Sequence, residues 1–505
     1  MGGIVLKQFL IGSASAAAIL AVMPGHAEAA SVDSKISALQ AQIKAQQQQL
    51  QQQQQLLTSL MTSENQTKAT VAQVQAVKTA KPSAVAVMSR SHKPGWRSAD
   101  GRNEIDLGAL LQVDSSIASY RPGNSAATFR KLQSGINARR AQLKVSGTFD
   151  EDFHFGLQYD FGGSNEALTA GVKAGFKQAV LTYTGFKPFG THLSLEFGYE
   201  SPPMFLDSAI PAAANLFIEH PNVEKIAGGI GAGPGRGTLG FRDYTNRWFT
   251  WFAFTGPKSG DTHDQSEGSA LIVATGRATY NVINNKSTKW QVGGDFQRII
   301  QPTGSPATIT LSDEAEDRVD TSTFITSEAI GTTANPLKGG GTLSAETAAE
   351  FGPVFLGGEY FHYDFQRRGL SDVNFWGAYG EVLYSLTGEQ HPYLAANGGW
   401  GNLSPAHPFS LKTGGMGAWE LGARYSYFDM NSQMGTSSQI NGGRTHELQF
   451  GVNWYVNDNV KFQLDWIHGF QGGIIGTHAV KLQSGSALAG NGRWDEIGIR
   501  SQWSF

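Results

Sequence analysis

Apolar and polar side chains alternate one for one in segment after segment from residue 104 to the end of the chain. In the segment 152–161, Phe153, Phe155, Leu157 and Tyr159 occupy every second position, and the positions between them hold polar residues or glycine. A period of two places such residues on one face of an extended strand. Each of these segments therefore predicts a β-strand with one apolar and one polar face.

Sixteen segments of this kind can be recognised. They cover residues 104–120, 135–149, 152–161, 175–186, 191–199, 237–244, 246–256, 269–284, 287–301, 344–352, 353–366, 372–387, 416–429, 442–456, 459–471 and 492–505. Most reach the about 9–11 residues that a tilted strand needs to cross a bilayer. Long and short connections alternate between them, as in barrels with tight turns at one end and loops at the other. The connection 388–415 should be short and is not, so either it is an insertion that folds inward or outward, or the strand count is wrong there.

Aromatic residues near the predicted strand ends match the interfacial girdles of a membrane barrel. They are Tyr120, Phe161, Phe186, Trp248, Phe254, Trp376, Tyr384, Tyr427, Trp454, Trp466, Phe470 and Trp494. The chain also ends with Phe505 on an alternating strand. A terminal aromatic residue in this position resembles the assembly signal of bacterial outer-membrane barrels.

The composition excludes several other classes of protein. The chain has no cysteine, which removes disulfides, thiolate metal sites and a cysteine nucleophile. A formal charge of −3 gives no global basic field for nucleic acid. No stretch after the N-terminus is apolar enough for a membrane-spanning helix, and open sheet edges cannot be satisfied in lipid. We therefore predict an all-β transmembrane barrel of about 16 antiparallel strands, with no cofactor.

The first residues are typical of a secretory signal peptide. Lys7 supplies a positive charge, and the apolar run 9–23 is shorter than the about 18–20 residues of a spanning helix. Ala27 and Ala29 then form a small-x-small cleavage pattern. We predict a signal peptide over residues 1–29.

Residues 31–80 have a helical pattern with apolar positions in alternating steps of three and four. These seam positions are Ile36, Leu39, Ile43, Leu50, Leu57, Leu60, Val71 and Val74. One helix cannot bury so narrow a seam, which favours a self-associating, Gln-rich coiled coil. The alternative is a disordered low-complexity segment over 46–55, although Leu50 interrupts the glutamines where the seam requires it. Pro82 and Pro94 then block a helix, so we predict a linker over 81–103 and the barrel domain over 104–505.

Several segments of the predicted barrel resemble the phosphate-selective porin O and P family. They are Ala-Arg-Arg-Ala-Gln-Leu at 138–143, Leu-Gln-Tyr-Asp-Phe-Gly at 157–162, Gly-Ala-Trp-Glu-Leu-Gly-Ala-Arg-Tyr-Ser at 417–426, Gly-Gly-Arg at 442–444 and Gly-Val-Asn-Trp-Tyr-Val-Asn at 451–457. The resemblance runs from about 105 to 505. It implies a trimer of sixteen-stranded barrels that passes anions, with a third loop folded inward and a pore lined by arginine and lysine.

The family's paired basic motif falls on Arg139 and Arg140 of this chain. Strand parity places Arg140 and Lys144 in the lumen and Arg139 at the barrel end or the interface. A charge in a wet lumen costs little, whereas one facing lipid at mid-depth costs about 2–4 kcal/mol. Arg140 and Lys144 are therefore explained equally well as wet lumen residues or as selectivity residues.

The third connection, 200–236, carries the remaining candidates for the pore lining. Its acids are Glu200, Asp207, Glu219 and Glu224, and its bases are Lys225 and Arg236. Family members usually have a basic residue shortly before the first proline of this loop, where this chain has Glu200. Residues 30–100 hold eight Lys or Arg and three Asp or Glu, which leaves a net charge of −8 for the barrel. Because fixed charge of one sign concentrates the opposite ion, this balance argues against strong anion selectivity.

Together these features predict a porin of the bacterial outer membrane, a water-filled channel for passive diffusion of small hydrophilic solutes, anions such as phosphate among them. Its expected partners are these solutes, outer-membrane lipid and further copies of the chain in a homotrimer. Two alternatives stay open: a general or carbohydrate-permeable porin without anion selectivity, and a protein that anchors the envelope through its coiled coil. An enzyme is not predicted, because His154, His362 and Asp364 are scattered and no Gly-x-Ser-x-Gly or His-Glu-x-x-His motif occurs.

Overall fold

The computed structural model describes residues 32–79, 84–88, 94–123, 130–162, 175–259, 270–314, 316, 318–473, 479–481, 487–489 and 491–505. The chain divides into two units, Met1–Pro82 and Ser83–Phe505, each described here by itself. The predicted signal peptide, 1–29, lies outside the described residues. Neither of the two described α-helices is long and apolar enough to cross a membrane.

The described elements follow in chain order. They are α1 (Val32–Thr79), β1 (Ala84–Met88), β2 (Pro94–Ser98), β3 (Glu104–Arg121), β4 (Arg130–Lys131), β5 (Gly135–Phe149), β6 (Phe153–Asp160), β7 (Gly175–Tyr183), η1 (Pro188–Gly190), β8 (Ser194–Glu200), η2 (Ala212–Ala214), α2 (Asn222–Gly231), β9 (Arg236–Tyr244), β10 (Trp248–Lys258), β11 (Ile272–Asn284), β12 (Thr288–Gln301), β13 (Ser312–Asp313), β14 (Ile325–Thr326), β15 (Leu337–Phe351), β16 (Val354–Arg367), β17 (Val373–Ser385), β18 (Tyr393–Leu394), β19 (Gly399–Trp400), β20 (Ala418–Ser432), β21 (Ile440–Tyr455), β22 (Val460–Gly472), β23 (Ala479–Lys481), β24 (Ala487–Ala489) and β25 (Arg493–Ser504).

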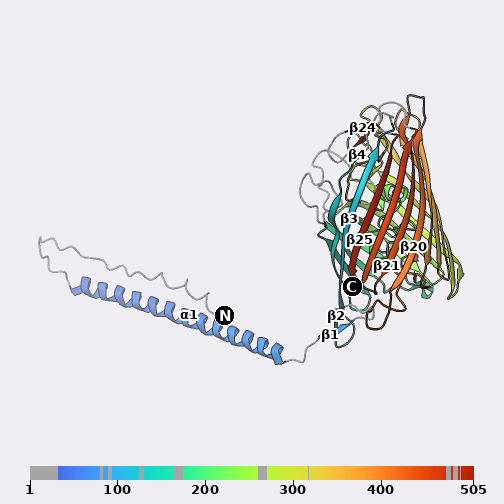
Figure 1. The fold of residues 1–505 in the computed structure, drawn as a ribbon. Helices are drawn as coiled ribbons and strands as arrows, with labels where there is room; N and C mark the ends of the chain where they lie inside the picture. The colour runs from blue at the N-terminus through green and yellow to red at the C-terminus, as the bar shows by residue number, and fades with distance from the viewer. Residues whose placement is uncertain are drawn as a thin grey trace. The chain divides into compact units, whose positions relative to one another are not determined.

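Sixteen of the described strands form a closed antiparallel barrel, so the predicted fold is confirmed. Each pairs with its neighbour in the chain order β3, β5 to β12, β15 to β17, β20 to β22 and β25. The barrel closes where β25 pairs with β3, from Arg493 opposite Arg121 to Ser504 opposite Leu110. Figure 1 shows these first and last strands of the barrel, cyan and red, side by side. Because the ring is closed, no strand of the transmembrane wall is an edge strand. Lipid therefore meets no row of unpaired backbone N–H and C=O groups.

The sixteen predicted strands correspond one to one to these barrel strands. The largest difference is at β15, which begins at Leu337 rather than at the predicted residue 344. The missed stretch contains three consecutive glycines and a register shift between Leu337 and Gly339. Glycines carry no side chain that could display a period of two, so the alternation is invisible there.

The barrel wall exposes apolar side chains and buries polar ones. Along β22, Phe462 and Leu464 are exposed, whereas Gln463 and Asp465, which alternate with them, are buried. A soluble sheet has the opposite arrangement, with apolar residues inside. This inverted pattern is the one that transmembrane barrels need, because their outer surface meets acyl chains.

A hairpin formed by β1 and β2 lies within the predicted linker 81–103. Its strand β2 pairs with the first residues of β3, from Gly95 opposite Asp106 to Arg97 opposite Glu104. The barrel sheet therefore extends further toward the N-terminus than the predicted boundary at residue 104. Pro94 is compatible with this strand because it is the first residue of β2, where proline is tolerated.

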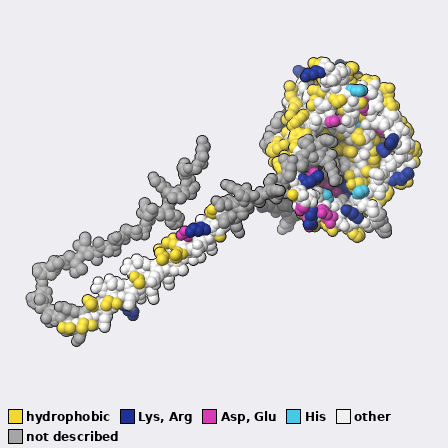
Figure 2. Space-filling view, turned by 90° about the horizontal axis from the view of Figure 1, so that it is seen from below, with side chains coloured by type: hydrophobic (Ala, Val, Ile, Leu, Met, Phe, Trp, Pro, Cys, Tyr) yellow, Lys and Arg dark blue, Asp and Glu magenta, His cyan; other side chains and the backbone are white. Residues whose placement is uncertain are grey.

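Helix α1 runs without a break from Val32 to Thr79. The seam residues with described side chains are exposed, at 50% for Ile36 and 62% for Leu39, for example. In Figure 2 most of the described helix surface is uncharged, with apolar side chains in separate groups along it. A helix of a coiled coil buries such a seam against partner helices, so the seam of a single copy is exposed.

The insertion between β17 and β20, residues 386–417, folds into the barrel. Its tip forms a hairpin of β18 and β19, and Trp400 within it is fully buried. Arg277 on β11 holds the tip, donating from Nη1 to the Asn397 carbonyl at 2.8 Å and from Nη2 to the Gly398 carbonyl at 2.9 Å. The inward alternative is therefore correct, and the strand count around this connection was right.

Candidate pore constriction

The third long loop, residues 201–235 and here called L3, crosses the interior of the barrel. Its backbone is hydrogen-bonded to inward side chains of strands around the wall. Gln502 donates to the Ala213 carbonyl at 2.7 Å, Lys461 to the Asn215 carbonyl at 2.7 Å, and Gln297 to the Ala227 carbonyl at 2.9 Å. These donors come from β25, β22 and β12, so L3 is fixed at several points around the barrel and narrows its lumen.

Arg139 and Arg140 both lie inside the barrel, where they face L3. Arg139 makes a bidentate pair with Glu219 of L3, at 2.6 and 2.8 Å. Arg140 donates to Gln112 at 2.6 Å and lies 4.0 Å from the same glutamate. The prediction that Arg139 lies at the barrel end or interface is wrong. A bulge in β5 opposite the step from Gln112 to Val113 inserts an extra residue and turns both arginines inward.

Glu219 is the centre of this basic cluster. Arg500 on β25 donates to it at 2.9 Å and is itself paired with Asp114 on β3 at 2.7 Å. Burial alone would raise the pKa of Glu219, but Arg139, Arg140 and Arg500 outweigh it and hold the pKa well below its usual range. The carboxylate is therefore ionised, and it fixes L3 to the arginine side of the wall.

The other predicted residues are spread around L3 rather than gathered at one point. Lys144 is half-buried on the same face of β5 as Arg140. Glu200 is buried 3.5 Å from Arg242, and Lys225 pairs with Asp313 at 2.8 Å. Arg236 donates at 2.6 Å to the carbonyl of Gly229 in α2. Glu200 and Lys225 are therefore paired with charged residues outside the predicted set, and Arg236 holds the backbone of L3.

On the side of the barrel opposite the arginine cluster, carboxylates hold the start of L3. The backbone N–H of Phe205 donates to Asp295 at 2.8 Å and that of Leu206 to Glu359 at 3.1 Å. Asp295, Glu346 and Glu359 offer ligand atoms within 4.8 Å of one another. Arg277 is the cation among them, paired with Glu346 at 2.8 Å.

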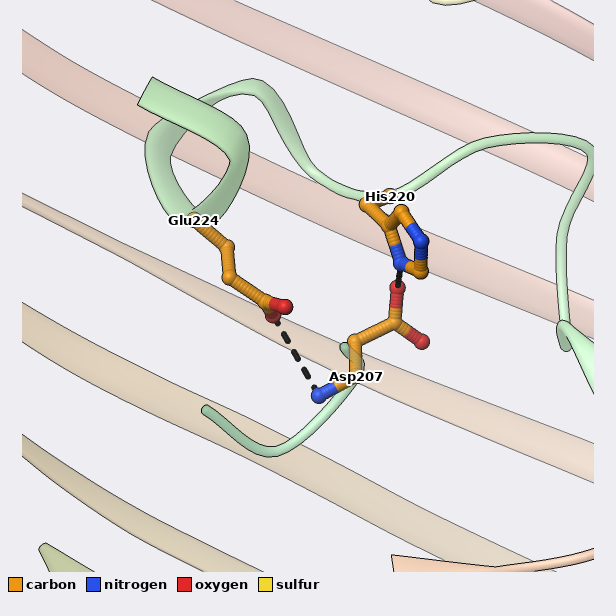
Figure 3. Close-up of side chains that lie close together, drawn as sticks. All are labelled: Asp207, His220 and Glu224. Atoms are coloured by element: carbon orange, nitrogen blue, oxygen red, sulfur yellow. Dashed lines mark hydrogen bonds and ion pairs between the residues drawn. The ribbon is translucent and has the colours of Figure 1, made fainter. Parts of the chain in front are cut away.

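A second acidic group lies next along L3. Figure 3 shows Asp207, His220 and Glu224, with the imidazole turned toward one carboxylate. His220 Nδ1 lies 2.6 Å from Asp207 Oδ2, and Glu224 accepts the backbone N–H groups of Asp207 at 3.3 Å and Ser208 at 2.6 Å. Burial and then the charge of Asp207 raise the pKa of Glu224 well above its usual value.

The fifth long loop, residues 302–336 and here called L5, also enters the barrel. Phe324 is stacked between Tyr120 and Trp494, with ring centroids 5.2 Å apart on each side. Tyr120 and Trp494 are fully buried, so their prediction as girdle residues is wrong. They lie on inward positions of β3 and β25 and anchor L5, whereas predicted girdle residues such as Phe161 and Phe186 are exposed.

Acidic side chains outnumber basic ones in the interior. Among the described residues, nineteen Asp or Glu and nine Arg or Lys are buried. Three of the basic ones, Arg139, Arg140 and Arg500, meet at one place, whereas the acidic ones are distributed over many strands and both loops, five of them on the wall from β12 to β17. The interior therefore has one basic cluster within a predominantly acidic lining.

Sequence reasoning missed the partners on the strands. Arg277, Glu359 and Arg500 are in contact with L3 and were not among the predicted residues. Each is a polar residue on the inward face of an alternating strand, so counting parity along every strand would have found it. Strand parity does not show which of these inward residues contact L3.

The chain is similar to several known proteins. The model of the family described as phosphate-selective porin O and P matches residues 117–471. Porin O of Pseudomonas aeruginosa is 24% identical over 394 residues, which cover 73% of this chain and 84% of that protein. Among solved structures, an anion-selective porin from Comamonas acidovorans superposes with a TM-score of 0.45 at 11% identity, covering 80% of this chain and 100% of that one. The outer membrane channel DcaP of Acinetobacter baumannii gives a TM-score of 0.46 at 10% identity, covering 81% and 99%.

The family match covers well over half of the chain and agrees with the resemblance found in the sequence. Porins are channels for passive diffusion rather than enzymes, and they reside in the bacterial outer membrane. The predictions of function class, of a non-enzymatic role and of location are thereby confirmed. The chain is an outer-membrane porin and belongs to the phosphate-selective porin O and P family.

Proposed function

We propose that this porin passes small hydrophilic solutes, anions such as phosphate among them, without strong selectivity for anions. The observation that carries the proposal is the excess of carboxylates in the interior, nineteen buried acids against nine buried bases in the described chain. Fixed negative charge attracts cations and repels anions. Many of the arginines are also paired, so they offer a passing anion little uncompensated positive charge.

The reversal potential under a salt gradient tests this proposal. In planar bilayers with a tenfold KCl gradient, we expect a chloride-to-potassium permeability ratio near or below one. Glu200→Gln should shift the ratio toward chloride, because it removes a carboxylate beside L3. Glu104→Gln, at the first residue of β3, is the matched control and should leave the ratio unchanged. A strong preference for chloride in the wild type would contradict the proposal.

Selectivity for anions is the second candidate function, favoured by the family and by one specific group of residues. Arg139, Arg140 and Arg500 place three guanidinium groups beside Glu219 and Asp114, a local excess of positive charge. In this view the residues that set selectivity are the predicted pore-lining set: Arg139, Arg140, Lys144, Glu200, Asp207, Glu219, Lys225 and Arg236. Inhibition of the chloride current by millimolar phosphate would favour this candidate.

A carbohydrate-permeable pore has less support. Buried aromatic rings do occur in the barrel, such as Phe205 against Phe361, with centroids 5.4 Å apart. Their faces are covered by L3 and α2 side chains in one apolar core. A sugar could not stack on them without displacing the loop.

We further propose that the mature chain begins after residue 29 and forms a homotrimer in outer-membrane lipid. Support comes from α1, whose exposed seam residues Ile36, Leu39 and Leu50 need partner helices to be buried. Light scattering of the detergent-solubilised protein should give the mass of three chains. Deleting 31–80 tests the alternative role: an intact channel together with a detached envelope would identify α1 as an envelope anchor.

A further inference from the structure

A small pocket lies at the end of the barrel where short turns join the strands. It has a volume of about 160 Å³ and is lined by the turn before β12, the end of β15 and the insertion 386–417. Lys286 and Ser287 on its rim are exposed. Because short turns face the periplasm in bacterial barrels, solutes reach this pocket from the periplasmic mouth of the pore.

Hydrogen bonds hold the walls of the pocket in place. The side-chain amide of Gln390 donates to the carbonyls of Ser287 at 3.1 Å and Gly352 at 2.9 Å, which attaches the insertion to two turns. The backbone N–H of His391 donates to Glu350 Oε1 at 3.1 Å. The three segments that line the pocket are therefore bonded to one another.

The lining contains one buried carboxylate with an unfilled acceptor. Glu350 is only 4% exposed, and its Oε2 has no hydrogen-bond partner among the described residues. A buried carboxylate of this kind is costly unless a cation or a proton compensates it. The imidazole of His391 is used elsewhere, with its nitrogens 2.7 Å from Glu420 and 2.8 Å from the Gly401 carbonyl.

Positive charge lines the other side of the pocket. Lys289 lies directly opposite Glu350 in the register of β12 and β15. Both side chains are in the described part of the chain, yet no ion pair joins them. Lys289 Nζ instead donates to Asn284 Oδ1 at 2.6 Å and lies 5.7 Å from the centre of the Tyr393 ring. An ammonium group has three N–H donors, so two remain for a ligand.

We propose that this pocket binds a small α-amino acid, a solute with an ammonium and a carboxylate group on the same carbon atom. The ammonium group donates to Glu350 Oε2, and the carboxylate accepts from Lys289 and Lys286. A cavity of about 150 Å³ holds benzene, and alanine has the same number of non-hydrogen atoms. The inference rests on the proposed function, since it names one class among the hydrophilic solutes of the pore.

Ligands with a single charge fit the pocket less well. An anion would pair with Lys289 but would be repelled by Glu350, which it would leave uncompensated. A cation would pair with Glu350 but would be repelled by Lys286 and Lys289. A zwitterion places each of its charges against the opposite charge of the pocket, so the pocket discriminates against both kinds of ion.

The test compares alanine with propionate, which lacks the ammonium group, and with alaninamide, which lacks the carboxylate. Binding to the full-length protein in detergent is measured by saturation-transfer difference NMR. We expect saturable binding of alanine, with an affinity at least about tenfold higher than that of either analogue, because each analogue loses a charge-assisted hydrogen bond.

Variants of the two charged walls provide the second arm. Glu350→Gln and Lys289→Gln should each weaken alanine binding at least about tenfold. Lys187→Gln removes an exposed lysine from the turn between β7 and β8, and as the matched control it should bind alanine like the wild type.

Absence of alanine binding, equal affinity for propionate or alaninamide, or wild-type affinity in both wall variants would overturn the proposal. If the variants do not fold, the three ligands on the wild type decide alone. The experiment measures no current, so its failure leaves the proposed ion preference untouched. A strong chloride preference would contradict the proposed function without changing the outcome of this binding test.

Discussion

A single extra residue in β5 determines how the arginine side of the constriction is built. Because of the bulge, Arg139 and Arg140 both point inward, and Arg139 rather than its neighbour forms the bidentate pair with Glu219. Both side chains of this pair are almost completely buried, at 5% and 1% exposure. An interaction of this kind is costly to break, since the remaining partner stays buried.

Replacing Arg139 with Gln should therefore destabilise L3. We expect a loss of about 3–5 kcal/mol in the free energy of unfolding, measured by guanidinium titration in detergent. Arg444→Gln is the control, because its pair with Asp429 is 55% exposed on the arginine side and should contribute less than about 1 kcal/mol. Equal losses in the two variants would contradict the assigned role of Arg139.

His391 makes the attachment of the insertion 386–417 depend on pH. Burial acts to lower the pKa of His391, but Glu420 at 2.7 Å and then Glu350 outweigh it and raise the pKa above its usual value of 6.5. A raised histidine pKa stabilises the folded state fully below about 6.5, and this contribution is lost as the pH rises through the folded pKa.

Amide hydrogen exchange measures this effect. After correction for intrinsic rates, residues 392–401 should be better protected at pH 6 than at pH 9. In His391→Gln, which carries no proton at either pH, the difference should disappear. Protection that rises with pH in the wild type would show that the imidazole is neutral when folded.

At the level of elements, the strands could be predicted from the sequence because lipid imposes a period of two along most of their length, the glycines at the start of β15 being the exception. Parity also identifies inward residues such as Arg500 in principle. The bulge that turns Arg139 inward leaves no mark on that pattern, and neither does the path of L3. L3 follows contacts with β12, β16 and β25, which are distant in sequence and come together only when the barrel closes.

The position of L5 also depends on contacts with strands that are distant in sequence, and one aromatic residue makes them. Phe324→Ala removes the ring between Tyr120 and Trp494, and loss of a buried phenylalanine costs about 3–5 kcal/mol. We expect L5 to detach, so hydrogen exchange in 318–330 should accelerate and single-channel conductance should rise. Phe186→Ala, at an exposed ring in a short turn, is the control and should change neither. Unchanged exchange in Phe324→Ala would show that other contacts hold the loop.

For the whole molecule, the arrangement inside the barrel follows from the solvent outside it. Apolar residues such as Leu464 and Ile499 are used on the outer surface, so the interior is left to charged and amide side chains, which need partners. L3, L5 and the insertion 386–417 supply many of these partners. The porin class thus follows from the barrel, whereas the ion preference depends on how the interior charges are paired.

The most direct test of this account is a measurement of whether the outer face of the barrel contacts lipid or water. The chain has no native cysteine, so a single cysteine with a spin label can be placed at Leu464, Ile499 or Leu343, with Leu411 in the insertion as a control outside the strands. In reconstituted bilayers, labels at the first three positions should be relaxed strongly by oxygen and weakly by a polar nickel complex, and the control label should show the reverse. Strong relaxation by the nickel complex at Leu464, Ile499 and Leu343 would place that face in water and contradict the account.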